Sequence, residues 1–189
     1  MKMRNWLAMS LLSGMAITLY AQRAVPPPPK PADSGLSLVA TMQFIQDKLN
    51  DTGSIKCISF TQNTTDYTTH SYSFKISVTK VVADPNQCRI SFHEKVTMDG
   101  KVKTDADFGF SVRDIQNVVV EPFAQFQTKQ NADRGIPNII ITSTNPPLKA
   151  LITDLPHGNE FDFDFKDADL ADRVAKAFLH AVELCGDGN

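Results

Sequence analysis

The sequence predicts a mainly β protein of the α+β class: a bent antiparallel seven-stranded barrel, or a strongly curled sheet, that a C-terminal helix caps. Three observations lead to this prediction. Short runs of alternating apolar and polar residues are separated by turn residues. The last run leads directly into a long amphipathic stretch. A further amphipathic stretch precedes the first run and predicts an extra N-terminal helix.

The N-terminal helix is predicted at residues 37–49. Ser37 is a favourable N-cap residue, because its hydroxyl can accept a hydrogen bond from a free backbone N–H of the first turn. Apolar residues with the spacing of one helix face follow it, at Leu38, Met42, Ile45 and Leu49. The sequence Asn-Asp-Thr-Gly at residues 50–53 is expected to end the helix.

Seven strands are predicted within residues 55–166. The first six lie at residues 55–62, 70–82, 87–98, 102–112, 115–120 and 138–143. Asp99 and Gly100 are a strong signal for a hairpin between the third and fourth strands. The second half of residues 117–135 is expected to be an exposed loop, and residues 148–157 a connection that holds a helical turn or a short strand.

The seventh strand and the closing helix form the clearest part of the pattern. Phe161, Phe163 and Phe165 alternate with polar residues, which predicts a half-buried strand. A helix capped by Asp167 is predicted at residues 168–185. Its apolar stripe consists of Leu170, Val174, Ala177, Phe178, Ala181 and Cys185. Because this stripe needs an apolar surface, the helix is expected to close one end of the barrel or to pack on the concave face.

Two stretches follow the pattern of a known family. Residues 110–120, Phe-Ser-Val-Arg-Asp-Ile-Gln-Asn-Val-Val-Val, place a short Asp-Ile turn between two strands, and residues 163–185 run from a strand into the closing helix. Over about residues 55–185, this order resembles the pleckstrin-homology-like superfamily, including GRAM-type domains. The resemblance implies a seven-stranded bent barrel capped by one helix.

The chain departs from this family in three respects. Its closing helix has no tryptophan, and Phe178 takes that place. The first hairpin loop, residues 63–69, has no basic residue, whereas members that bind phosphoinositides have Lys and Arg there. A predicted signal and an extra helix also precede the domain. The resemblance therefore implies the fold without the lipid-binding residues.

Residues 1–21 are predicted to be a secretory signal peptide. Lys2 and Arg4 form a short basic region, an apolar stretch follows, and Leu-Tyr-Ala at residues 19–21 is an acceptable cleavage site. An uncleaved N-terminal anchor is the alternative. No later segment is long and apolar enough to predict a membrane span. We therefore expect a secreted or periplasmic protein.

Residues 22–35 are predicted to be a proline-rich linker, followed by a single domain at residues 36–186. Four consecutive prolines in the linker favour an extended polyproline II conformation. We expect it to act as a spacer, and the alternative is a ligand for a proline-binding module.

Composition and charge exclude several functions. The chain has a net charge of −2, and removal of the predicted signal would take away two positive charges and leave −4. Binding to nucleic acid or to an anionic membrane needs clustered Lys and Arg, so neither is expected. A hydrophobic share of 42% is enough for a folded core.

Three cysteines, Cys57, Cys88 and Cys185, remain after the predicted cleavage. Export favours oxidation, and an odd number is most simply explained by one disulfide and one free thiol. Cys88 shares its predicted strand face with Ile90 and Phe92, and Cys185 lies in the apolar stripe of the closing helix. We therefore predict a Cys88–Cys185 disulfide, and three buried thiols are the alternative.

The sequence contains no recognisable catalytic motif, and none of the four histidines has metal-ligand spacing with another His or Cys. An acidic cluster is the one feature that favours calcium. It comprises Asp162, Asp164, Asp167, Asp169 and Asp172. The simpler interpretation places Asp162 and Asp164 on the wet face of an edge strand, and Asp167 and Asp169 at a helix N-terminus. We therefore expect no metal and no cofactor.

Ala175, Leu179 and Val182 form a second apolar strip on the closing helix. A broad contact with the N-terminal helix accounts for this strip. The functional alternative is a partner-binding groove or a dimer surface, so these residues are the candidate partner surface.

The leading hypothesis is an exported, non-enzymatic binding or scaffold module whose partner is a protein, a peptide or an apolar ligand. One alternative is a hydrolase-like envelope enzyme whose site forms only in the fold, around His93 and Glu94. Glu94 shares parity with the inward residues of the third predicted strand, so it is expected at the barrel rim, with a buried carboxylate of raised pKa as the alternative. The other alternative is an envelope structural or assembly protein that uses the proline-rich linker as a spacer.

Overall fold

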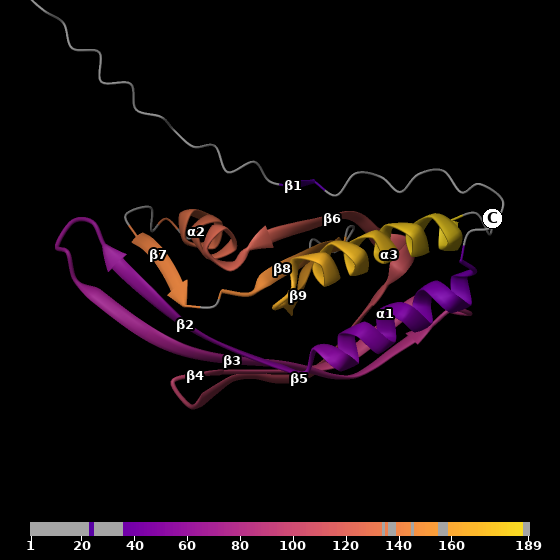
Figure 1. Cartoon of the computed structure of the whole chain (residues 1–189), viewed down its shortest axis with the longest axis horizontal. Helices are drawn as coiled ribbons and strands as arrows, with labels where there is room; N and C mark the ends of the chain where they lie inside the picture. Colours follow the sequence, from indigo (N-terminus) through magenta and orange to yellow (C-terminus); the bar gives the residue numbers. More distant parts are fainter. Residues whose placement is uncertain are drawn as a thin grey trace, which may run out of the picture.

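The computed structural model describes residues 23–24, 36–133, 135, 139–144, 146–154 and 159–186. Within these residues the chain forms two antiparallel β-sheets, three α-helices and one 3-10 helix (Figure 1). The mainly β, α+β class is confirmed. The predicted signal at residues 1–21 lies outside the described residues, as does the predicted linker at 22–35 except for Arg23 and Ala24.

The larger sheet has five strands in the order β5-β4-β3-β2-β7 and is strongly curved (Figure 1). Its strands are β2 (Ser54–Asn63), β3 (Thr69–Asp84), β4 (Arg89–Met98), β5 (Lys101–Ser111) and β7 (Ile139–Thr144). The hairpin between β4 and β5 turns at Asp99 and Gly100, whose φ angles of 51° and 75° are those that this tight turn requires. This turn agrees with the hairpin signal in the sequence.

The smaller sheet has four strands in the order β1-β6-β8-β9 and lies over the concave side of the larger one (Figure 1). Its strands are β1 (Arg23–Ala24), β6 (Ile115–Pro122), β8 (Leu148–Asp154) and β9 (Asn159–Phe165). Strand β8 occupies the first part of residues 148–157, where the sequence predicts a connection with a helical turn or a short strand.

Of the two predicted forms, the strongly curled sheet fits the larger sheet, and neither described sheet closes into a seven-stranded barrel. The 3-10 helix η1 (Val112–Asp114) turns the chain out of the larger sheet after β5, so that β6 begins the second sheet. Strand β7 later returns to pair with β2. The edge strands β5 and β7 do not pair with each other, so the larger sheet stays open.

Helices α1 (Leu38–Thr52) and α3 (Ala168–Gly186) lie side by side over the concave face (Figure 1). The Ser37 hydroxyl accepts a hydrogen bond from the Ala40 N–H at 3.2 Å, and the Asp167 carboxylate accepts one from the Leu170 N–H at 2.7 Å. Both predicted caps are therefore present, and both helices extend the predicted ranges by only a few residues. Among the residues described, no helix is long and apolar enough to cross a bilayer.

Helix α2 (Phe123–Asp133) contradicts the predicted exposed loop. Its sequence is mostly polar, and only Phe123 and Phe126 at its start are apolar and buried. Two aromatic residues do not make a helical stripe, so the periodicity that reveals the other helices is missing here. The contacts of these two rings with the sheets hold the helix in place.

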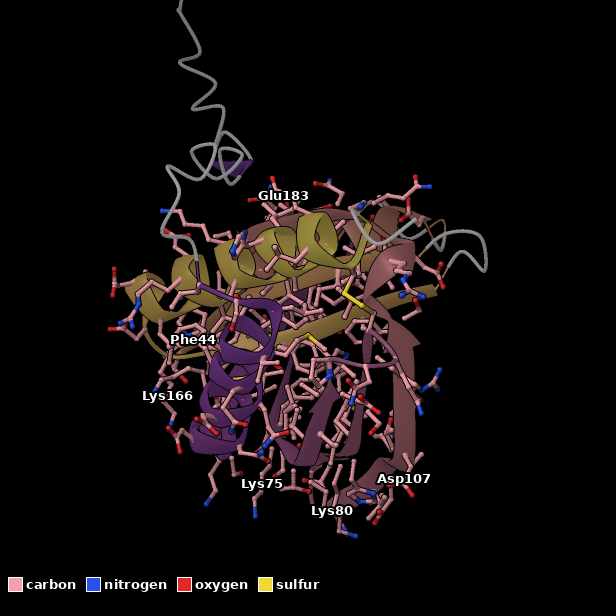
Figure 2. All side chains as sticks on the ribbon, turned by 90° about the vertical axis from the view of Figure 1, so that its right-hand side faces the viewer. Phe44, Lys75, Lys80, Asp107, Lys166 and Glu183 are labelled. Carbon is pink, nitrogen blue, oxygen red and sulfur yellow. A yellow bond between two sulfur atoms is a disulfide. The ribbon has the colours of Figure 1, made fainter. Side chains whose placement is uncertain are left out.

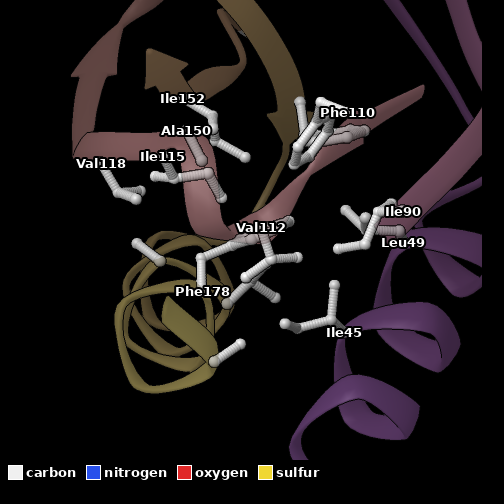
Figure 3. Packing of buried hydrophobic residues seen from close by; sticks show 14 of the residues in the cluster. Ile45, Leu49, Ile90, Phe110, Val112, Ile115, Val118, Ala150, Ile152 and Phe178 are labelled. Atoms are coloured by element: carbon white, nitrogen blue, oxygen red, sulfur yellow. The ribbon is translucent and has the colours of Figure 1, made fainter. Parts of the chain in front are cut away.

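Phenylalanines join the two sheets. The ring of Phe163 on β9 lies 5.0 Å from that of Phe92 on β4 and 6.0 Å from that of Phe178 on α3. On β5, Phe110 stacks on Phe161 of β9 at 5.1 Å. Figure 3 shows Phe178 and Phe110 among branched aliphatic side chains that come from α1 and from both sheets. The core thus lies between the sheets, where α1 and α3 fill it.

The structure contains the Cys88–Cys185 disulfide that the face pattern of the sequence favours (Figure 2). It joins the start of β4 to the end of α3, with the two Cα atoms 6.0 Å apart. The Arg113 side chain also donates a hydrogen bond from Nε to the Cys185 carbonyl oxygen at 3.1 Å. The third cysteine, Cys57, is a buried free thiol. The C-terminal end of α3 is therefore tied to the larger sheet.

Replacing both Cys88 and Cys185 by alanine should destabilise the fold by about 2–5 kcal/mol, because the bridge closes a long loop and so limits the unfolded chain. Urea unfolding measures the change. Cys57→Ala is the matched control, since it removes a buried sulfur without opening a bridge. An unchanged unfolding midpoint in the double variant would contradict the structural role of the disulfide.

Candidate functional site

A polar groove of about 450 Å³ lies between the larger sheet and helix α2. Its lining residues are Ser59, Thr61, Asn63, Thr68, His70, Tyr72, Phe74, Met98, Gln127, Asn131 and Ile141. The volume is in the range of small-molecule sites. No Asp, Glu, Lys or Arg is among these residues, so the groove suits an uncharged ligand better than an ion.

The groove arises because the side chains on the inner face of β2 and β3 change from apolar to polar along the strands. Near the start of β2, Ile55 pairs with Ile76, and both side chains are buried. Further along, the inner positions hold Ser59 opposite Tyr72. Helix α1 packs against β3 and covers the apolar part. The polar part projects beyond it toward α2 and remains open as the groove.

Aromatic side chains form the floor of the groove. Ring centroids are 6.5 Å apart from His70 to Tyr72, 6.5 Å from Tyr72 to Phe74, and 6.1 Å from Phe74 to Phe123 of α2. His70, Tyr72 and Phe74 lie on the inner face of β3, at alternate positions of the strand. The floor therefore offers aromatic surface, whose faces attract weakly positive C–H groups.

Two amide side chains of α2 line the opposite wall. Gln127 and Asn131 are four residues apart and so share one face of the helix. Neither side chain hydrogen-bonds to another group in the described part of the chain. Each amide offers two donors and one acceptor. The wall thus carries polar groups that a ligand can use.

A buried ion-pair cluster lies behind α2. Lys149 of β8 is only 4% exposed and forms ion pairs with Asp162 and Asp164 of β9. Its ammonium group also lies 5.5 Å from the Phe123 ring centroid and 4.9 Å from that of Phe126. This cation–π contact connects the first turn of α2 to the smaller sheet.

Asp164 is the most unusual member of the cluster. It is 5% exposed, and its Oδ1 lies 2.9 Å from Lys149 Nζ. Neither carboxylate oxygen has a well-aligned hydrogen bond to the described residues, so the contact is an ion pair. Burial, and then the nearby Asp162 charge, raise the pKa of Asp164 to about 6 against the opposing effect of Lys149. Although burial disfavours the ammonium form, the two carboxylates raise the pKa of Lys149.

Three further titratable groups face this cluster. The pKa of each of Cys57, Glu94 and Glu121 is raised, and burial is the largest cause. Repulsion from Asp164 adds to the effect at Cys57, and repulsion from Asp162 adds to it at Glu94. A raised pKa keeps Cys57 in the thiol form at neutral pH, which makes it a poor nucleophile.

His93 and Glu94, the residues of the hypothetical enzyme site, do not converge. As neighbours on β4 they point to opposite faces of the sheet. His93 lies on the outer face, 3.0 Å from Asp105 and 2.8 Å from Asp107. Glu94 lies on the inner face, is half-buried and faces the Lys149 cluster.

The acidic cluster does not come together as a cation site. Asp162 and Asp164 pair with Lys149, and Asp167 caps α3. In the described part of the chain, no group of three or more His, Cys, Asp or Glu residues is arranged to hold a metal ion. Strand β9 is an edge strand, as predicted. Asp164, however, is buried and not exposed to solvent, because the larger sheet and α1 cover it.

The candidate partner surface is only partly available. Ala175 is fully buried, as the predicted contact with the N-terminal helix would require. Leu179 and Val182 are half-buried against the core. Because α3 packs tightly on α1 and on β6, most of this strip faces the interior. A role for Leu179 and Val182 in partner binding stays a prediction.

Replacing Asp164 by asparagine should flatten the pH dependence of stability. Because the pKa of Asp164 is raised from 3.8 to about 6, its contribution is complete below about pH 4 and is lost as the pH rises through about 6. We expect this group to lower the free energy of unfolding by about 3 kcal/mol between pH 4 and pH 7. Urea unfolding at both pH values tests this, with the exposed Asp169→Asn as control. If the free energy of unfolding changes between the two pH values as much in Asp164→Asn as in the unaltered chain, the raised pKa of Asp164 is refuted.

Replacing Lys149 by methionine should destabilise the fold by about 3–5 kcal/mol at pH 7, because two carboxylates lose their buried counter-charge. The loss should be smaller at about pH 4, where the Asp164 carboxylate, whose pKa is raised to about 6, is protonated. Thermal unfolding at the two pH values measures both effects. Lys95→Met is the control, since its partner Asp105 is exposed. A loss that does not vary with pH would rule out the charge explanation.

No protein-family model matches the chain, and neither a curated protein nor a solved structure shows significant similarity to it. The resemblance to the pleckstrin-homology-like superfamily therefore stays a prediction. The function must be argued from the groove and the residues around it.

Proposed function

We propose that this chain is an exported, non-enzymatic binding module whose groove beneath α2 holds an uncharged polyhydroxylated ligand, such as an oligosaccharide. The observation that carries the proposal is the lining of the groove, where the described residues combine amides, hydroxyls and aromatic rings without Asp, Glu, Lys or Arg. The Cys88–Cys185 disulfide supports export, because such bridges persist in oxidising compartments.

The groove has the chemistry that a sugar requires. Gln127 and Asn131 of α2 offer donors and acceptors, and Ser59 and Thr61 of β2 offer hydroxyls. The Tyr72 ring of β3 offers an apolar face for the C–H groups of a sugar ring. An ionic ligand would find no opposite charge of Asp, Glu, Lys or Arg among the described lining residues, and a purely apolar one would leave these polar groups without partners.

The groove is held in shape before a ligand binds. The ring contact of Phe74 with Phe123 fixes the distance between its floor and α2. The Lys149 ammonium group holds Phe123 and Phe126 from the other side. A preformed site costs less ordering free energy on binding, which favours a binding role.

The side chains near the groove favour binding over catalysis. His70 makes no hydrogen bond to a hydroxyl group among the described groove residues, so the pairing of base and nucleophile that covalent catalysis uses is not formed. Cys57 is buried, and its raised pKa disfavours the thiolate. His93 is turned to the outer face and pairs with two aspartates.

Replacing Tyr72 by alanine should weaken binding of a neutral tetrasaccharide about tenfold, because the ligand loses its aromatic surface. Glucose and N-acetylglucosamine tetrasaccharides are the probes, and titration calorimetry with ligand-observed NMR is the measurement. Tyr67→Ala is the matched control, since Tyr67 is 75% exposed and lies outside the groove. Asn131→Ala should also weaken binding.

Three outcomes would overturn the proposal. The first is that no tetrasaccharide binds the unaltered chain at millimolar concentration. The second is that Tyr67→Ala weakens binding as much as Tyr72→Ala. The third is that an uncharged extended peptide binds the groove while the sugars do not, which would assign the groove to a different class of ligand.

A further inference from the structure

We propose that a second site, a lysine-lined cleft at the other end of β2, binds the phosphate group of a small phosphate-bearing molecule. The cleft has a volume of about 650 Å³. Its lining residues are Ser54, Ile55, Lys56, Lys75, Pro146 and Lys166. They come from the start of β2, from β3, from the segment between β7 and β8, and from the residue after β9. This site is independent of the sugar groove.

The three lysines place positive charge together, and no described carboxylate neutralises it. Lys56 and Lys75 lie directly opposite each other in the β2–β3 pairing, an arrangement that is unfavourable for like charges. Lys166 adds a third ammonium group to the same cleft. No carboxylate of the described residues lies within ion-pair distance of these lysines, whereas Lys95 and Lys149 each have an aspartate partner. An anion in the cleft would relieve this repulsion.

The three side chains are free to meet a ligand. Lys56, Lys75 and Lys166 are all exposed, and Figure 2 shows the latter two at the surface, on the side of the molecule where α1 lies. Each is an unhindered chain with three donors at its end. The ammonium groups can therefore move to meet a ligand while the helices and strands stay in place.

The backbone adds hydrogen-bond donors to the same place. Strand β7 pairs with β2 only from Ile58 to Asn63. In the described part of the chain, the first residues of β2 therefore have a strand partner on the β3 side alone. The open side of a strand presents free N–H groups, which bind anions. Ser54 contributes a hydroxyl group at this edge.

The chemistry favours phosphate over carboxylate. Lysines act as point charges that suit the tetrahedral phosphate dianion, whereas arginine provides the planar, two-point recognition that carboxylates prefer. None of the described residues that line this cleft is an arginine. The exposed Pro146 ring and the volume of the cleft leave room for an organic part of the ligand. Free phosphate esters and lipid headgroups share this chemistry.

The test uses the full chain and three phosphate probes. Titration calorimetry compares phenyl phosphate with inorganic phosphate, and co-sedimentation compares phosphatidylcholine vesicles with and without phosphatidic acid. We expect phenyl phosphate to bind more tightly than inorganic phosphate. Lys56→Gln, Lys75→Gln and Lys166→Gln should each weaken that binding about tenfold, as for loss of a hydrogen bond between charged groups.

Lys103→Gln is the matched control, because Lys103 is an exposed lysine on β5 outside the cleft. Loss of binding to vesicles in the three cleft variants alone would assign the phosphate to a lipid headgroup. Loss confined to phenyl phosphate would assign it to a free ester. Absence of binding by all the probes, or an equal loss in Lys103→Gln, would overturn the proposal.

A stability measurement keeps the test independent of the choice of probe. Because Lys56 and Lys75 repel each other, Lys75→Gln should raise the melting temperature in phosphate-free buffer. Added phosphate should raise the melting temperature of the unaltered chain more than that of Lys75→Gln, because binding stabilises the folded state. An equal response of both chains to phosphate would contradict the inference.

Discussion

The stacking of Phe163 against Phe178, with Phe92 on the other side, is the contact on which the rest of the structure depends. No described strand of one sheet pairs with a strand of the other, so packed side chains hold the sheets together, and the disulfide ties α3 to the larger sheet. Both candidate sites require this contact. The groove combines β2 and β3 of one sheet with α2, which follows β6 of the other. The cleft combines Lys56 of one sheet with Lys166 at the end of β9.

The buried charges around Lys149 favour one register of the smaller sheet. Glu121, Lys149 and Asp164 lie directly opposite one another across β6, β8 and β9. A slip of β9 by one residue would bring a phenylalanine to the charged face and an aspartate to the apolar one. The ion pairs therefore favour one register, although they contribute little net stability because both partners lose their hydration. The same charges hold α2 at its first turn.

The features that the sequence predicts are local, and those that it misses depend on distant neighbours. The caps at Ser37 and Asp167 and the turn at Asp99 follow from a few adjacent residues. The arrangement of the two sheets depends on the pairing of β7 with the distant strand β2, which the alternation of apolar and polar residues cannot predict. The burial of Asp164 depends on the second sheet, since strand parity alone assigns it to the wet face. Gln127 and Asn131 become a site only because α2 forms.

Strand β2 carries parts of both candidate sites, and its geometry keeps them apart. Ser54 lines the cleft and Ser59 lines the groove. At a rise of about 3.4 Å per residue, the two positions are roughly 17 Å apart along the strand. The buried Cys57 and the apolar pairs of β2 and β3 lie between them. A small ligand cannot bridge that distance through the core. Changes at the two sites should therefore act independently, as expected for groups separated by more than about 10 Å.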